Sequence, residues 1–116
     1  MKIPTVKNTK KQSDKVEFLL SFPKSALYFQ GHFPQIAILP GFTQVHFAMF
    51  FAKKYWSFTD DLTHIKKLRF SKIITPETDI SLTIEYFSPQ KITFRYFLAD
   101  ATHSSGEIHF GTINNV

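Results

Sequence analysis

The chain contains no cysteine, which excludes disulfide bonds and metal sites built on thiolates. It also lacks any apolar run approaching the roughly 18 residues that a membrane-spanning helix needs. Residues 1–15 are rich in lysine and polar side chains, and they include no apolar block of the kind found in a signal peptide. These absences predict a cytoplasmic protein that does not act in a membrane.

The length of 116 residues predicts a single domain spanning 1–116, in which residues 1–14 form an extended or flexible lead-in. A hydrophobic content of 43% is enough for a folded core. Phenylalanine is abundant, with 14 residues against 4 tyrosines and 1 tryptophan. So many apolar rings indicate a thick core, an apolar tunnel or an apolar subunit interface. The net charge of +5 favours an acidic partner, although a basic solvated surface would also explain it.

Alternation of apolar and polar residues predicts strands along most of the chain. The segment 62–74 alternates irregularly around two lysines, so we expect a bulge or a strong twist there. The polar segment 100–106 is predicted to be a loop. The predicted strands are 16–23, 62–74, 78–87, 91–98 and 107–113.

One helix is predicted, beginning at Pro40-Gly41 and ending near Trp56. Apolar residues fall on every side of it, which is typical of a buried helix. Its one ionisable side chain before Lys53 is His46. The fold class is therefore α+β, with an antiparallel sheet of about five strands wrapped around one long central helix. Such a sheet leaves an edge strand open, and pairing of edges into a dimer would close it.

Two short motifs stand just before the helix. Gly31-His32-Phe33-Pro34 is followed, after five residues, by Pro40-Gly41. With the predicted elements, this pair of motifs resembles the hotdog fold, and more narrowly the 3-hydroxyacyl-acyl carrier protein dehydratases.

The chain departs from the pattern of that family at three positions: Gln35 and Ala37 replace the usual Gly and Pro, and His46 replaces the carboxylate on the helix. The run Ile38-Leu39-Pro40-Gly41-x-x-Gln44-x-His46 is more similar to divergent dehydratase-like members of specialised pathways such as aryl polyene synthesis.

The resemblance implies the loss of water from a 3-hydroxyacyl thioester, in fatty acid or polyene-type biosynthesis, to give the trans-2-enoyl thioester. This reaction needs a base, an acid and a donor to the thioester oxygen. The resemblance assigns the base to His32 and the donor to the backbone N–H of Gly41. His46 would supply the acid, either directly in a pair of imidazoles that share one proton or through a bound water.

Plainer explanations remain open for these residues. His32 could be a loop histidine bonded to backbone, and Pro40-Gly41 could serve only as a helix start. His46 could be a buried polar residue in a subunit that binds acyl thioesters without dehydrating them. A thioesterase of the same fold is a further alternative, but such enzymes usually carry an acidic residue on the helix, and none occurs between Gly41 and Trp56.

The remaining expectations concern ligands and partners. No cofactor is expected beyond the phosphopantetheine of an acyl carrier protein, which would approach the basic residues between Lys53 and Lys72. No metal is expected, because His64, His103 and His109 lack the spacing of metal ligands, and no nucleic-acid motif is present. We expect a homodimer, a higher oligomer of dimers, or a heterodimer with another hotdog subunit. The residues expected to line the acyl site are Phe33, Pro34, Leu39, Pro40, Phe42 and Phe50.

Overall fold

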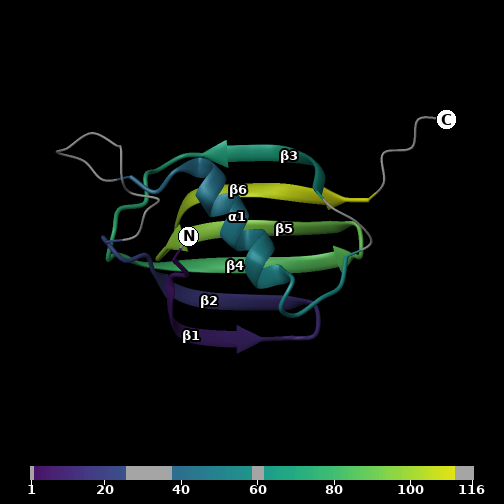
Figure 1. Cartoon of the computed structure of the whole chain (residues 1–116), viewed down its shortest axis with the longest axis horizontal. Coiled ribbons are helices and arrows are strands. Elements are labelled where there is room, and N and C mark those ends of the chain that lie inside the picture. Colours follow the sequence, from purple (N-terminus) through teal and green to yellow (C-terminus); the bar gives the residue numbers. More distant parts are fainter. Residues whose placement is uncertain (1, 26–37, 59–61, 112–116) are drawn as a thin grey trace.

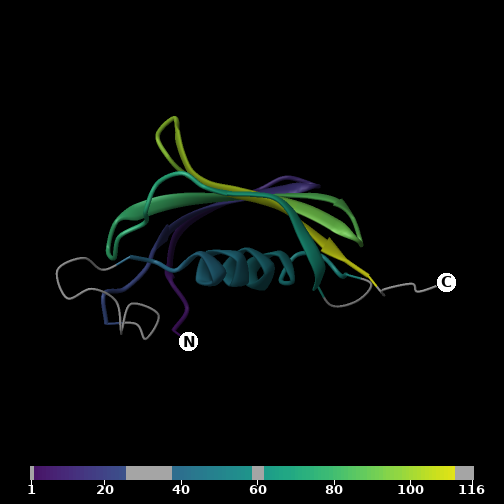
Figure 2. The same ribbon diagram turned by 90° about the horizontal axis from the view of Figure 1, so that it is seen from above.

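The computed structural model describes residues 2–25, 38–58 and 62–111. Within these ranges the chain forms one helix and a six-stranded antiparallel sheet in the order β1-β2-β4-β5-β6-β3. Figure 1 shows helix α1 crossing the strands diagonally, and Figure 2 shows the sheet curving over it. The elements are β1 (Thr5–Lys11), β2 (Lys15–Ser21), α1 (Gly41–Ala52), β3 (Leu62–Phe70), β4 (Asp79–Ser88), β5 (Lys91–Leu98) and β6 (Ala101–Phe110).

The core lies between the concave face of the sheet and α1. Alternate residues of β2, β4 and β5 point into it, as the period of two in the sequence requires. Each fully buried aliphatic side chain contributes about 1.5–3 kcal/mol relative to exposure. The rings of Phe18 in β2 and Phe51 in α1 lie 4.7 Å apart between their centroids, so they join the C-terminal end of the helix to the sheet. The inward strand residues are Val16, Phe18, Leu20, Ile80, Leu82, Ile84, Ile92, Phe94 and Tyr96.

The prediction of one helix and an antiparallel sheet is confirmed, with differences in extent. The sixth strand is β1, which lies in the expected lead-in. The helix ends at Ala52 rather than Trp56, and β3 ends at Phe70 rather than residue 74. The prediction of a loop at 100–106 is wrong, because β6 begins at Ala101.

The prediction that α1 is buried on every side is also wrong for this chain by itself. Phe42 is 70% exposed, and His46 is exposed as well. The face toward the sheet is buried, including Val45, Phe47, Ala48 and Phe51. The helix therefore has a second, largely apolar face that the sheet does not cover. None of the helices in the described ranges has the length and apolar character that crossing a membrane would take.

Strand β3 is an edge strand, hydrogen-bonded only to β6 among the described strands. Its register shifts between Lys66 and Arg69, and Lys67 takes a left-handed conformation with φ of 55°. The expected bulge in this segment is thus confirmed. Within the bulge, Leu68 lies over Gly106 of β6, and a Cβ added to Gly106 would be 3.2 Å from Cδ1 of Leu68.

Candidate active site

Backbone hydrogen bonds of residues before and after Pro40 fix the first turn of α1. The backbone N–H of Leu39 donates to the carbonyl of Ile74 at 2.8 Å, and the N–H groups of Thr43 and Gln44 donate to the Pro40 carbonyl at 3.1 and 3.2 Å. In the described ranges, the N–H groups of Gly41 and Phe42 have no backbone acceptor. Free N–H groups at the positive end of the helix dipole stabilise a developing negative charge.

Gly41 lies directly beneath the side chain of Phe70, the last residue of β3. A Cβ atom added to Gly41 would be 2.7 Å from Cζ of that ring and 3.0 and 3.1 Å from its two Cε atoms. Only glycine leaves room for this contact with the ring in its present position. The start of α1 and the end of edge strand β3 are therefore in direct contact.

An apolar groove of about 410 Å³ runs from this place between α1 and β3. Among the described residues that line it, His46 is the only ionisable one. The imidazole packs edge-on against the ring of Phe47, with centroids 4.9 Å apart, and stacks at 6.4 Å with Phe50. The groove is lined by Gly41, Phe42, Val45, His46, Met49, Leu62, Ile65, Leu68 and Phe70.

A second pocket of about 410 Å³ lies by the same glycine and the same Phe70 ring. Its walls are more polar, and Lys72 supplies a cation to them. Gly41 and Phe70 line both spaces, so they mark the junction between the apolar groove and this second pocket. The second pocket is lined by Ile38, Leu39, Pro40, Gly41, Gln44, Phe70, Ser71, Lys72 and Ile73.

The structure brings together some of the expected site residues. Gly41, Phe42 and His46 share the apolar groove, whereas Leu39 and Pro40 line the second pocket. Phe50 is partly buried beside His46 and does not line the groove. The residues expected at 32–34, His32, Phe33 and Pro34, lie outside the described residues, so their expected roles stay predictions.

Phe70 and Leu68 were not foreseen as site residues. Nothing in the pattern of β3 distinguishes them from other apolar residues, because their contact with the helix arises from the path of the edge strand.

One buried polar side chain in the first turns of the helix has no hydrogen-bond partner among the described residues. The Thr43 hydroxyl is fully buried and makes no hydrogen bond within the described part of the chain. It does not line either of the two spaces beside Gly41. It therefore costs stability without serving the geometry of the groove.

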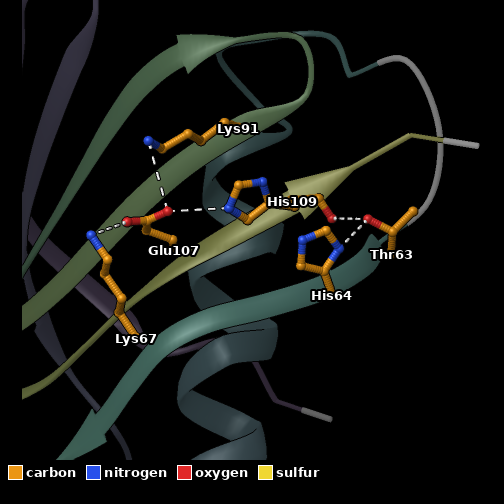
Figure 3. A network of polar contacts seen from close by, with 6 residues as sticks. All are labelled: Thr63, His64, Lys67, Lys91, Glu107 and His109. Carbon is orange, nitrogen blue, oxygen red and sulfur yellow. Dashed lines mark hydrogen bonds and ion pairs between the residues drawn. The ribbon is translucent and has the colours of Figure 1, made fainter.

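A second cluster of ionisable groups lies on the face of the sheet away from α1 (Figure 3). His64 and His109 stack with centroids 4.6 Å apart and planes 7° apart. Glu107 accepts a hydrogen bond from His109 Nε2 at 3.1 Å and pairs with Lys67 and Lys91. Hydrogen bonds from His109, the larger contribution, and from Lys67 lower the pKa of the Glu107 carboxyl.

The sequence could not reveal this cluster, since His64 faces His109 only through the pairing of β3 with β6. In the part of the chain that the structure describes, no group of three or more acidic or histidine side chains could hold a metal ion.

Comparison with known proteins places this geometry in a family. The family model for ApeI-like dehydratases, described as ApeI dehydratase, matches residues 8–107. No curated protein sequence matches the chain.

Two solved structures are similar over almost the whole chain. The dehydratase heterocomplex ApeI:P from Xenorhabdus doucetiae has a chain that is 27% identical, with a TM-score of 0.84 and coverage of 94% of this chain and 97% of that one. An uncharacterised protein from Erwinia carotovora subsp. atroseptica is 26% identical, with a TM-score of 0.77 and coverage of 97% and 98%. With the hotdog arrangement of sheet and helix, these matches establish that the chain belongs to the ApeI-like dehydratase family.

Proposed function

We propose that this chain removes water from a 3-hydroxyacyl thioester carried on acyl carrier protein and releases the trans-2-enoyl thioester. The observation that carries the proposal is that Gly41 and His46 line one apolar groove. A groove of this kind suits an acyl chain. Free N–H groups at one end and an imidazole along the wall are two of the functions that the reaction requires.

In the proposed reaction, the thioester carbonyl oxygen accepts hydrogen bonds from the free N–H groups at the start of α1. His32 removes a proton from the carbon next to the carbonyl, and the electron pair forms the carbon–carbon double bond. The hydroxyl on the neighbouring carbon leaves with a proton as water. The N–H groups stabilise charge on the oxygen as it develops, which is where such donors contribute most to the rate.

We assign the proton for the departing hydroxyl to His46 or to a water that it holds. An imidazole can act as an acid because it titrates close to neutral pH. The described helix carries no carboxylate that could take this role. For the same reason, the chain lacks the acidic helix residue that commonly activates water in thioesterases of this fold.

We infer that the active unit is a pair of hotdog subunits. The exposed side of α1 and the open edge of β3 form one continuous apolar surface through Phe42, Leu62, Leu68 and Phe70. Edge strands and apolar patches of this kind are typical of protein interfaces. The similar chain comes from the ApeI:P heterocomplex, so the second subunit is either another copy or a different hotdog chain.

The carrier protein would dock from the side of the second pocket. Lys72 lines that pocket, and Arg69 and Lys66 are exposed on the neighbouring edge strand. These cations complement an acidic carrier. A phosphopantetheine arm entering there would place its thioester beside Gly41.

Mass spectrometry of a loaded carrier protein tests the reaction directly. Purified protein is incubated with 3-hydroxyacyl carrier proteins of several chain lengths, and dehydration appears as the loss of one water from the carrier-bound acyl group. Release of the free acid would instead identify a thioesterase, and no change at any chain length would identify an acyl-binding subunit. The assay is run on the chain alone and with a candidate hotdog partner, with light scattering to establish which assembly is present.

Substitution of the two histidines then tests their roles. His32→Ala should abolish turnover while leaving the assembly intact, whereas His64→Ala, on the opposite face of the sheet, should leave turnover unchanged. His46→Glu should retain or raise activity if His46 takes the place of a carboxylate. An inactive but folded His46→Glu protein would argue that the two imidazoles work as a specific pair.

A further inference from the structure

Gln44 is a buried polar residue that the proposed chemistry does not use. Its side chain is only 3% exposed, although it lies in the first turn of α1, close to Gly41. Burying an amide is costly unless its donors and acceptor are satisfied. Its hydrogen bonds therefore reveal what the residue holds in place.

The side-chain amide of Gln44 joins the helix start to the sheet. Nε2 donates to the backbone carbonyl of Leu39 at 3.1 Å, and Oε1 accepts from the hydroxyl of Ser104 in β6 at 2.6 Å. The backbone carbonyl of Gln44 accepts from the hydroxyl of Tyr96 in β5 at 2.8 Å. Because the Leu39 carbonyl can only accept, the amide has one orientation, and Ser104 must be the donor to its oxygen.

Hydrogen bonds to both backbone polar groups of Leu39 fix the turn from Leu39 to Gly41. The carbonyl of Leu39 is held by Gln44, and its N–H is held by the carbonyl of Ile74. The N–H of Gly41, which has no backbone acceptor among the described residues, follows two residues later in the chain. Any rotation of the Leu39–Pro40 unit would re-aim that N–H.

We propose that Gln44 is a positioning residue, which fixes the Leu39–Pro40–Gly41 turn so that the Gly41 N–H points at the thioester oxygen. This proposal rests on the proposed function. Gln44 does not touch the reacting atoms, and it acts through the backbone. An interaction that strengthens as charge develops on the oxygen affects kcat more than KM.

Gln44→Leu removes both side-chain bonds while keeping a similar volume. We expect kcat of the assembled protein to fall roughly 10- to 100-fold, with KM within about twofold, as for a donor that is misplaced by a fraction of an ångström. Ile92→Val is the matched control, because it weakens the core at the other end of β5 and leaves the Gln44 network intact. A fall in kcat no larger than that of Ile92→Val, or a rise in KM alone, would overturn the proposal.

Gln44→Glu gives a second test that a general loss of stability cannot imitate. A protonated carboxyl can donate to the Leu39 carbonyl and accept from Ser104, as the amide does, whereas a carboxylate cannot donate. Burial favours the protonated form. The kcat of Gln44→Glu relative to the unaltered protein should therefore rise as the pH falls, while the ratio for Gln44→Leu stays flat. A flat ratio for Gln44→Glu would refute the role.

The amide resonance of Gly41 in a ¹H–¹⁵N spectrum separates this proposal from the proposed function. It should shift in Gln44→Leu and remain in place in Ile92→Val, whether or not the reaction has been identified correctly. If the unaltered protein does not dehydrate the thioester, the proposed function has failed. An unshifted Gly41 resonance in Gln44→Leu would show that the turn does not depend on Gln44.

Discussion

Replacing Gly41 with alanine tests whether the glycine is needed for folding or for access to the helix start. The new Cβ would lie 2.7 Å from Cζ of Phe70, so the ring must move. Phe70 is 49% exposed, so a displaced ring loses at most about half of the 1.5–3 kcal/mol that a buried phenylalanine contributes. Against this loss, alanine restricts the unfolded chain and gains about 0.4–1 kcal/mol. The free energy of unfolding should therefore stay within about 1 kcal/mol of the original value.

Activity should respond very differently. The methyl group would stand at the junction of the two spaces, where the thioester must approach the N–H groups of Gly41 and Phe42. Displacing the carbonyl by about 1 Å would cost roughly 100-fold in turnover. Turnover is followed by mass spectrometry of the carrier-bound acyl group, and stability by urea unfolding.

Gly106→Ala is the matched control. Its Cβ would lie 2.9 Å from Cε2 of Phe94, a core ring that is only 2% exposed. Overpacking of this kind costs about 1–3 kcal/mol, but the folded fraction should keep its turnover. If Gly41→Ala keeps full turnover per folded molecule, the approach of substrate to this glycine is refuted. Restored turnover in Gly41→Ala combined with Phe70→Ala would attribute the loss to the displaced ring instead.

Three further predictions concern stability and assembly. Thr43→Val should raise the free energy of unfolding by about 1 kcal/mol in urea titrations, because it removes a buried hydroxyl without a partner; a decrease would mean that the hydroxyl is satisfied in solution. The lowered pKa of Glu107 contributes stability above the ordinary carboxyl pKa of 4.5, which is lost as the pH falls through the lower pKa of the folded state. Glu107→Gln should thus flatten the acid side of the stability profile, and equal slopes for both proteins would contradict the pairing. Phe42→Asp should leave the isolated chain as stable as before, since the ring is 70% exposed and an acidic residue suits a helix N-terminus, yet it should weaken association at least tenfold by light scattering. Phe87→Asp, on an exposed ring of β4 that does not line the groove, serves as its control, and equal effects of the two would argue against the groove as the interface.

The regular alternation in the sequence predicted the central strands well. Expected segments 78–87 and 91–98 correspond to β4 and β5 almost residue for residue. The same reasoning found the second half of β6 but failed for its first half, which is small and polar. Ser104 and Gly106 face inward there, and their small size makes room for Gln44, for the ring of Phe94 and for the side chain of Leu68.

Only the part of the candidate site that lies on the single helix α1 could be predicted from the sequence. Gly41 and His46 belong to one segment, so their nearness follows from the sequence. The opposite wall could not be predicted, because the positions of Leu68 and Phe70 beside the helix depend on the bulge in β3 and on the pairing of β3 with β6. The same limit applies to Gln44, whose partners lie on two other strands.

The apolar pattern of α1 has a different consequence. A helix that is apolar on all sides predicts burial on all sides, yet one side carries an exposed Phe42 and an exposed His46. The sequence and the single chain agree only if another subunit covers that side. In the proposed pair of hotdog subunits, the partner would add further residues beside His46, so the proposed role of His46 as a proton donor would depend on which hotdog chain is present. Comparisons of His46 variants therefore test the chemistry only in the assembled protein.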